Sequence, residues 1–436
     1  MKIAVIGAGI SGLSCAYRLS QAGYDVTLFE ANDYFGGHTH TVDVSLDGTT
    51  FGVDTGFLVF NHKTYPELTK LFDELGIETV ATDMSFSVKS PVDSLLGKRS
   101  LEWAGGDLDA VFAQRRNALN PAFLRMIADI LRFNKQSTAM ALSGELAADD
   151  LSLGAFLDRH GYSEKFREWY LLPMAGCIWS CPTAQMLAFP AATFIRFCHN
   201  HGLLQVNDRP QWQTVKGGAR QYVDKLLAAI PGKRLHTPVI GVTRNVLGAT
   251  HQIKIETREA AYLFDHVVMA SHSDDSLRML KDASADESRL LAAVRYQPNR
   301  AVLHTDASCL PNKRKAWSAW NYQSAGGKEP MVCVHYLINQ LQPLPFTTPV
   351  IVSLNPIDPP RPELVIASYD YSHPVFDAAA TSAQRQLPAI QGQRNTWFAG
   401  AWTGYGFHED GLKSGLAVAQ AIARQGIASL HEMQAA

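Results

Sequence analysis

Three glycines near the N-terminus have the spacing of a dinucleotide-binding turn. Gly7, Gly9 and Gly12 follow the β-branched run Lys2–Ile6 and open a segment with helical apolar spacing. Gly7 permits a tight turn, Gly9 lets the backbone approach a pyrophosphate, and Gly12 lets the helix pack closely on the strand. The helix N-terminus presents N–H groups and a partial positive charge to the phosphates. The segment therefore predicts a dinucleotide site.

An acidic residue closes the second strand of this βαβ unit. Glu30 ends the β-rich run Asp25–Phe29, eighteen residues after Gly12. A carboxylate there can accept hydrogen bonds from ribose hydroxyls, and it would repel the 2′-phosphate of NADP. These residues favour NAD or FAD and do not separate the two.

A second glycine pair follows directly. Gly36 and Gly37 allow another close backbone approach, which NAD binding does not require. His38 and His40 would share one face of an extended strand and could bind a metal. Because no carboxylate or cysteine lies nearby at ligand spacing, we expect no metal site. A further turn at Gly56 could meet a flat ring.

The C-terminal residues contain a third glycine-rich turn. The expected strand Thr396–Trp402 contains Gly400, and the expected helix Leu412–Arg424 is preceded by Gly411. A helix beginning at Gly411 would offer its N–H groups and its dipole to a site. A second helix terminus of this kind, about four hundred residues from the first, favours FAD over NAD.

Composition sets the broad class. A chain of 436 residues is too long to fold around one ordinary hydrophobic core, so two joined domains are expected. A net charge of −2 with 46% hydrophobic residues gives no reason to expect a nucleic-acid partner. The sequence shows neither a signal peptide nor a transmembrane stretch, so we expect a cytoplasmic protein, with peripheral membrane contact left open. The scattered cysteines (positions 15, 177, 181, 198, 309 and 333) indicate reduced thiols.

The order of the patterns predicts an α/β protein with a discontinuous first domain. We assign residues 1–60, 205–290 and 390–436 to a dinucleotide-binding domain. Residues 61–204 and 291–389 would form a substrate-binding domain, with a largely helical block at about 85–204. The apolar faces of that block would suit a lid over an apolar substrate, or would simply form core. We expect segment 177–182 to form a pocket wall.

Seven segments spread along the chain carry a family resemblance: IGAGISGL, FGGHTHTV, DTGFLVFNHKTYPEL, CIWSCP, FCHNHGLLQ, RPQWQTVKGG and GYGFHEDGLKSG. The chain resembles the FAD-binding amine-oxidase superfamily. More narrowly, it is similar to the N-terminal FAD-binding half of plant cyclopropane-fatty-acid synthases, without their methyltransferase half. The resemblance implies a Rossmann-like FAD-binding domain of the amine oxidase and phytoene desaturase type, with an inserted α+β substrate domain.

The resemblance also implies which residues hold FAD. In such proteins the strand matching Val239 contacts the adenine, and the C-terminal helix faces the N1–C2=O2 edge of the flavin. An arginine usually follows the glycine pair, whereas this chain has His38. The implied cofactor-binding residues are Gly7, Gly9, Ile10, Ser11, Gly12, Glu30, Ala31, Gly36, Gly37, His38, Thr39, Gly56, Phe57, Val239, Gly400, Ala401, Asp410, Gly411 and Leu412. Because residues 400–411 contain no cysteine for a thioether, we expect non-covalent FAD.

The expected activity is hydride removal from an apolar substrate, such as a fatty acyl chain, with oxygen or another carrier as electron acceptor. His408 and Glu409 precede the C-terminal helix and could act as acid or base, or could only shape the loop. One alternative is an amine or polyamine oxidase, with Trp402, Tyr405 and Phe407 in an aromatic cage. The other is a non-catalytic flavoprotein partner of a separate lipid methyltransferase.

Overall fold

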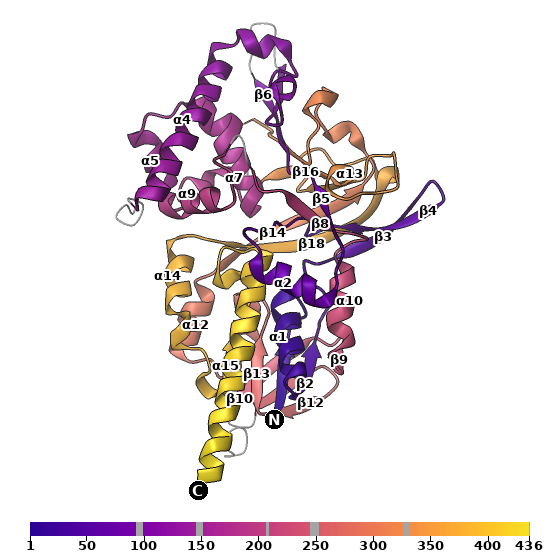
Figure 1. Cartoon of the computed structure of the whole chain (residues 1–436), viewed down its shortest axis with the longest axis vertical. Coiled ribbons are helices and arrows are strands. Elements are labelled where there is room, and N and C mark those ends of the chain that lie inside the picture. The colour runs from indigo at the N-terminus through magenta and orange to yellow at the C-terminus, as the bar shows by residue number, and fades with distance from the viewer. Residues whose placement is uncertain (93–98, 145–150, 206–208, 245–252, 327–330, 436) are drawn as a thin grey trace.

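The computed structural model describes residues 1–92, 99–144, 151–205, 209–244, 253–326 and 331–435. A five-stranded parallel sheet lies at the end of the molecule that carries both termini (Figure 1). The GxGxxG segment folds as predicted, because the first strand runs through the glycine turn into a buried helix, α1 (Ile10–Gln21). In spatial order the strands are β19 (Thr396–Phe398), β13 (His266–Met269), β1 (Lys2–Ile6), β2 (Asp25–Phe29) and β9 (Gly232–Arg234).

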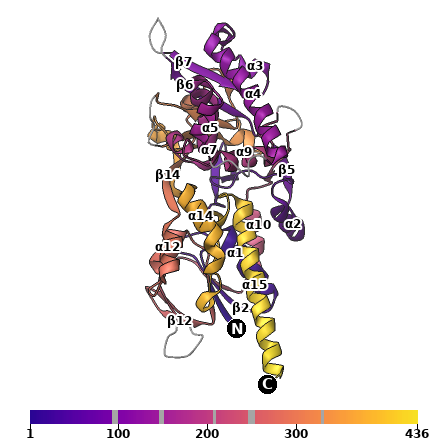
Figure 2. The same cartoon turned by 90° about the vertical axis from the view of Figure 1, so that its left-hand side faces the viewer.

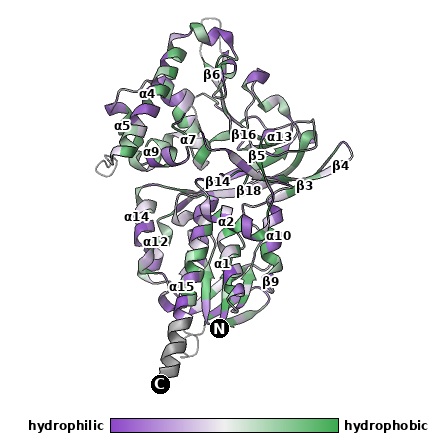
Figure 3. Ribbon diagram, viewed as in Figure 1, coloured by the Kyte–Doolittle hydropathy of each residue, from purple (hydrophilic) through white to green (hydrophobic). Residues whose placement is uncertain are grey.

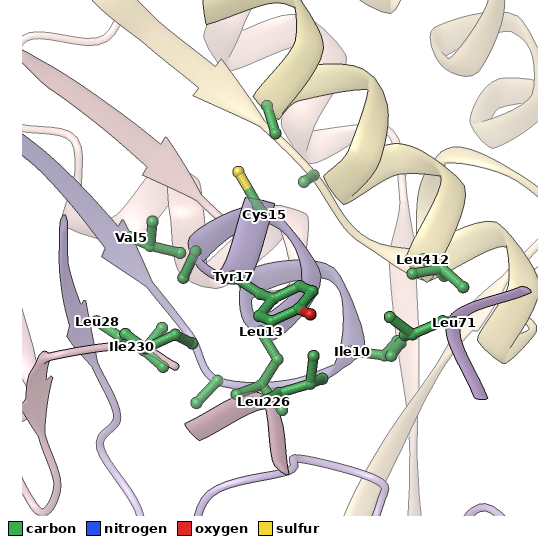
Figure 4. Packing of buried hydrophobic residues seen from close by; sticks show 14 of the residues in the cluster. Val5, Ile10, Leu13, Cys15, Tyr17, Leu28, Leu71, Leu226, Ile230 and Leu412 are labelled. Carbon is green, nitrogen blue, oxygen red and sulfur yellow. The ribbon is translucent and has the colours of Figure 1, made fainter. Parts of the chain in front are cut away.

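Four helices share the hydrophobic core on one side of this sheet. Leu13 of α1 packs with Leu28, Leu226 and Ile230, and Leu412 lies near the start of α1 (Figure 4). The burial of several large aliphatic side chains, each contributing about 2 kcal/mol, fixes α1 against the strands. The other three helices are α2 (Pro66–Leu75), α10 (Arg220–Ala228) and α15 (His408–Ala435).

The opposite side of the sheet is covered by a separate core. It contains strands β10 (Val239–Arg244), β11 (Ile253–Thr257) and β12 (Ala261–Phe264), which form a small antiparallel sheet. Helices α11 (Ser273–Met279), α12 (Ala285–Ala292) and α14 (Ala378–Gln386) complete this layer (Figure 2). The parallel sheet is thus buried on both faces, as doubly wound sheets are, and its strands are correspondingly hydrophobic (Figure 3).

Close packing of α1 on its neighbours depends on glycine. A Cβ on Gly12 would overlap the carbonyl oxygen of Gly7, and a Cβ on Gly415 would overlap the carbonyl oxygen of Ser11. The last helix therefore crosses the start of α1 at backbone contact. It begins at His408, three residues before the predicted Gly411, so the predicted start of that helix is wrong. The Asp410 carboxylate accepts hydrogen bonds from Tyr405 and Phe407 N–H, which folds the preceding turn onto the first turn of the helix.

A seven-stranded mixed sheet forms the second half of the molecule. The β-rich runs expected between residues 301 and 369 are all strands of it. The prediction of a helical block from residue 85 is wrong at its start, because β6 and β7 are also strands of this sheet; their alternation of buried and partly exposed residues is short and weak. In spatial order the sheet is β18 (Val365–Val375), β14 (Arg295–His304), β17 (Ile351–Leu354), β16 (Cys333–Leu337), β15 (Trp320–Gln323), β6 (Phe86–Val92) and β7 (Arg99–Ala104).

The helical part of the insertion lies at the end of the molecule away from both termini (Figure 1). Asn120 caps its longest helix, α4 (Pro121–Ser143), and accepts hydrogen bonds from the N–H groups of Ala122 and Phe123, as the Asn-Pro signal predicted. The other helices are α3 (Leu108–Val111), α5 (Leu153–Arg159), α6 (Glu164–Phe166), α7 (Leu172–Trp179), α8 (Thr183–Met186) and α9 (Ala191–Asn200). A 3-10 helix at residues 115–119 precedes α4, and a π-helical turn at residues 167–171 precedes α7.

Two strand pairs connect the halves. A hairpin forms from β3 (Thr41–Leu46) and β4 (Thr49–Asp54) around Asp47-Gly48, and β5 (Thr79–Thr82) pairs with β8 (Trp212–Val215). All six cysteines are buried thiols. Within the described residues no helix combines the length and hydropathy needed to cross a bilayer.

Candidate FAD and substrate site

The N-terminal glycine turn leaves room for a phosphate. Gly9 is the N-cap of α1, and a Cβ placed on it would meet no atom within 4 Å. Its φ of −70° would suit other residues, so backbone strain does not explain the glycine. The space lies where the first-turn amides of α1 converge, which is the geometry that holds a pyrophosphate. The residues present therefore fit the diphosphate of FAD.

Glu30 lies at the end of β2, beside this turn. Its carboxylate accepts hydrogen bonds from the N–H groups of Ala8 (2.8 Å) and Asn32 (3.0 Å). These bonds fix its orientation, and the remaining lone pairs can accept from ribose hydroxyls. Thr237 N–H donates to the Glu30 carbonyl (2.7 Å), which brings the segment leading to Val239 against the same strand end. Ala31 is exposed next to it.

The second glycine pair packs directly on the first turn. Gly36 N–H donates to the carbonyl of Ala8 (2.9 Å), and a Cβ on Gly37 would lie 3.0 Å from the Cα of Gly9. Both glycines have positive φ values, 124° and 59°, which other residues rarely adopt. A Cβ on Gly56 would overlap the His38 carbonyl oxygen. The turns at Gly9, at Gly36-Gly37 and at Gly56, which were predicted separately along the sequence, are therefore in contact.

His408 lies at the start of α15 within a buried polar trio. Its Nε2 is 2.6 Å from the Tyr222 hydroxyl, which is 2.5 Å from the Thr39 hydroxyl. The His408 ring stacks on Phe57 with centroids 3.9 Å apart. Burial lowers the pKa of His408 to about 3, so the ring is neutral at physiological pH. His408, Thr39 and Phe57, which the sequence assigned to one site, are thus brought together.

Glu409 faces a different element. Its two carboxylate oxygens accept hydrogen bonds from the N–H groups of Glu67 and Leu68, both at 3.0 Å, at the N-terminus of α2. No side chain near the start of α2 caps it, and the Thr64 hydroxyl has no partner among the described residues. The Glu409 carboxylate supplies the cap instead, together with a favourable interaction with the helix dipole.

The remaining C-terminal residues pack α15 in place. Gly400 N–H donates to the Ser414 hydroxyl (2.9 Å). A Cβ on Gly411 would lie 2.8 Å from Ile10 and 3.6 Å from the Cβ of Ala401, and Leu412 is fully buried. Gly411 therefore contacts the first turn of α1 rather than forming the helix terminus.

Partly buried histidines gather where β18 faces the second glycine pair. The His38 ring centroid lies 4.9 Å from that of Tyr371, 5.1 Å from that of His373 and 6.4 Å from that of His272. His38 Nε2 is buried without a hydrogen-bond partner among the described residues. His38 Nε2 is therefore available for a hydrogen bond to FAD, substrate or water.

Hydrogen bonds fix the tautomer of His373. The Asn299 amide oxygen accepts from Asn355 (2.7 Å), so its NH₂ group donates to His373 Nδ1 (2.9 Å). His373 therefore carries its proton on Nε2. Burial lowers its pKa to about 4, and burial likewise lowers the pKa values of His38 and His272. The cluster is neutral at pH 7.

Sequence reasoning did not find Asn299, Tyr371 or His373. One signal was present, because Tyr369, Tyr371 and His373 alternate along β18 and so share a face, although the strand expected from the sequence, Leu364–Tyr369, ends before the last two. That face contacts the segment after the glycine pair, where the Tyr369 ring centroid is 4.5 Å from that of His40. The sequence around these residues does not show which distant segment this face of β18 contacts.

An apolar cavity of about 100 Å³ borders this region. The predicted pocket wall contributes Trp179 and Cys181, and β18 contributes Pro374, which follows His373 in sequence. Phe376, also in the lining, contacts the position of Gly406 in the turn before α15. The cavity thus lies between the helical insertion and the turn before α15. The other residues that line the cavity are Gln185, Met186, Ala188, Phe189, Arg295, Val375 and Asp377.

The proposed aromatic cage is not assembled. Trp402 is buried in the core beneath the parallel sheet and donates its indole N–H to the Ser271 carbonyl. Phe407 instead stacks on Phe197 in the helical insertion, with ring centroids 4.9 Å apart. The expectation that Trp402 and Phe407 share a cage is therefore wrong. Among the described residues, one group could hold a metal, His272 with Asp274 and Asp275, and its Asp274 is exposed.

Comparison with known proteins agrees with this geometry. Residues 10–337, more than half of the chain, match the family described as flavin containing amine oxidoreductase. The chain belongs to this family. Membership gives it FAD as cofactor and places it among the FAD-dependent oxidoreductases.

Curated relatives match parts of the chain. A flavin-containing monoamine oxidase of Mycobacterium tuberculosis is 28% identical over 265 residues, 57% of this chain and 53% of that protein. The chain therefore spans about half the length of this relative. A 4,4'-diapophytoene desaturase of Staphylococcus aureus is 34% identical over 105 residues, 20% of each chain.

Solved structures show the same fold over nearly the whole chain. A fatty acid isomerase from P. acnes superposes with a TM-score of 0.64 and 16% identity, covering 97% of this chain and 98% of that one. Cyclohexylamine oxidase from Brevibacterium oxydans gives a TM-score of 0.66 and 17% identity, covering 97% and 99%. At these identities the likeness shows the fold alone.

Proposed function

We propose that the protein oxidises an apolar substrate, and that this substrate carries a fatty acyl chain or a related lipid chain. The apolar cavity lined in part by Pro374, the residue after His373, carries the proposal. An aliphatic chain gains about 25 cal/mol for each Å² that it buries against such a wall. A cationic amine would be favoured there by an unpaired carboxylate that balances its charge. The one carboxylate in the lining, Asp377, is paired with Arg295 at 2.8 Å.

The names of several relatives support an apolar substrate. Those similar in part of their sequence include carotenoid desaturases, and a similar fold occurs in a fatty acid isomerase. Monoamine and putrescine oxidases are also among the similar proteins, so the family does not choose between the substrate classes. The resemblance to plant cyclopropane-fatty-acid synthases stays a prediction, as does a methyltransferase partner.

FAD, when bound, supplies a two-electron acceptor for hydride. The glycine turns and Glu30 would hold its adenosine and diphosphate. We propose that His38 and His373 orient the reacting group, since each is neutral and neither adds charge to an apolar site. His408 would support the cofactor through the Thr39–Tyr222 contact. For Glu409 we propose a structural role, because both carboxylate oxygens already cap α2.

Anaerobic reduction of the bound flavin tests the substrate class. We expect acyl lipids to bleach the visible flavin absorbance, whereas primary amines and polyamines leave it unchanged. Dithionite serves as the control for a reducible flavin. Bleaching by amines and not by acyl lipids would overturn the proposed substrate.

Replacing His373 tests its role. The change His373→Phe removes the Nε2 donor while keeping an aromatic ring, and we expect substrate-driven bleaching to slow about 100-fold, within the range for proton-handling groups. Flavin content and the melting temperature report whether the fold is kept. The matched control is Tyr369→Phe on the same face of β18, which should leave the rate unchanged. Equal rates for both variants would contradict the role of His373.

A further inference from the structure

The outward face of α4 exposes a line of leucines. Leu124, Leu131 and Leu142 are 44%, 56% and 73% exposed. At about 100° per residue, their spacing places all three within about 20° of one line along the helix. The line spans about 27 Å at 1.5 Å per residue. Leu119, just before the helix, is 87% exposed.

The sequence leaves two uses open for the apolar faces of the insertion, a lid or core, and the buried residues of α4 agree with core. Phe123, Met126 and Phe133 are buried in the protein core, while Leu131 points to solvent, and α4 contributes nothing to the cavity lining. Large aliphatic side chains with this exposure lose the free energy that burial would give, about 1 to 2 kcal/mol each. Together they form an apolar line that lacks a cover within the described residues.

The charges on α4 sum to a positive value. Arg125, Arg132 and Lys135 are exposed on this helix. Its one acidic residue, Asp129, is buried, pairs with both Arg125 (3.4 Å) and Arg132 (2.9 Å), and accepts a hydrogen bond from the Ser163 N–H group. With three cations against one acid, the helix carries an excess of two positive charges beside the leucines, although the whole chain has a net charge of −2.

We propose that this face of α4 docks on the surface of an anionic lipid bilayer. Leucines enter the headgroup region while neighbouring lysines and arginines contact anionic lipids, as in helices that lie in the membrane interface. Each cation near such a surface adds an attraction that salt weakens. Helix α4 lies at the end of the molecule away from both termini (Figures 1 and 2).

The docking face and the cavity belong to one rigid unit. Phe133 of α4 packs with Phe194, and Phe194 packs with Trp179 of the cavity wall, with ring centroids 6.4 and 5.9 Å apart. Docking would therefore bring the cavity near the bilayer. The inference goes beyond the proposed function, because vesicle binding does not depend on which substrate is oxidised.

Vesicle flotation with the full-length, FAD-loaded chain tests the docking. We expect the protein to float with vesicles of phosphatidylcholine and phosphatidylglycerol, to bind pure phosphatidylcholine more weakly, and to dissociate at high salt. The triple change Leu124→Gln, Leu131→Gln and Leu142→Gln should weaken binding at least about tenfold. The matched control is Leu235→Gln with Leu263→Gln, which alters two exposed leucines at the other end of the molecule and should bind normally.

A second variant keeps the test independent of the leucines. Arg125→Gln with Lys135→Gln should weaken binding to the anionic vesicles and reduce its salt dependence, with flavin content unchanged. Absence of flotation, or equal loss in the Leu235 and Leu263 control, would overturn the proposal. So would a concentration-dependent dimer that the triple change abolishes, because a second copy of the chain would then cover α4.

Discussion

The change Gly9→Val should give a folded protein that does not bind FAD. The backbone of Gly9 has φ of −70°, and a Cβ there meets no protein atom within 4 Å, so the fold tolerates a side chain. The added methyl groups would occupy the space that the diphosphate needs beside the first-turn amides of α1. We expect at least a 100-fold loss of FAD affinity, equal to about 2.7 kcal/mol. Fluorescence titration of the apoprotein with FAD measures it.

The neighbouring Gly12 gives the matched contrast. A Cβ on Gly12 would overlap the Gly7 carbonyl oxygen, so Gly12→Ala should lower the melting temperature as well as FAD binding. Circular dichroism separates the two outcomes, because Gly9→Val should keep the wild-type melting temperature of the apoprotein. Wild-type FAD affinity in Gly9→Val would show that the diphosphate lies elsewhere.

The protein should lose stability steeply between pH 6.5 and pH 4, because two fully buried histidines are neutral in the fold. Burial lowers the pKa of His304 to about 4 and that of His335 to about 3, from an ordinary value of 6.5. In this window the unfolded chain binds more protons than the folded chain, so stability is complete above pH 6.5 and falls with pH. At pH 5 the two groups together cost about 4 kcal/mol, at about 1.4 kcal/mol per group and pH unit.

A hydrogen-bond chain across the seven-stranded sheet explains why neither ring accepts a proton easily. Asp306 N–H donates to His304 Nδ1 (3.0 Å), so His304 donates from Nε2 to the Ser353 hydroxyl (2.6 Å). Ser353 then donates to His335 Nδ1 (2.6 Å), and His335 Nε2 donates to Gln323 (2.9 Å). Protonating either ring would replace an acceptor with a donor inside this chain.

Urea unfolding at a series of pH values measures the effect. The change His335→Gln should reduce the pH dependence of the unfolding free energy, whereas His62→Gln, which alters an exposed histidine, should leave it unchanged. An unfolding free energy that stays constant from pH 7.5 to pH 5 would contradict the assignment.

The parts of the site that local sequence carries were predictable. Gly7, Gly9 and Gly12 need only the strand before them and the helix after them to specify a dinucleotide turn. The Asn120 cap and the Asp47-Gly48 hairpin are equally local. In each case the residue forms a turn or caps a helix only a few positions away in the sequence. The contact that explains the residue therefore lies inside the same short segment.

The parts that depend on distant contacts were not predictable. Nothing near Glu409 indicates that its carboxylate caps a helix 341 residues away. His373 and Asn299 meet only because β18 pairs with β14, and their neighbour His38 comes from the other half of the fold. Leu131 is exposed because the rest of the insertion covers a different face of α4. The periodicity of apolar residues along the helix does not show which face will be covered.

The Glu409 cap also bears on how the chain matures during synthesis. Helix α2 emerges from the ribosome early, but the carboxylate that caps it belongs to the last helix, which also packs on α1. Strand β19 at the sheet edge arrives equally late. We therefore expect α1, α2 and the parallel sheet to complete their packing only after the C-terminal residues have been synthesised. A ribosome-bound chain that ends before residue 396 should be protease-sensitive in its first hundred residues, although their sequence is complete.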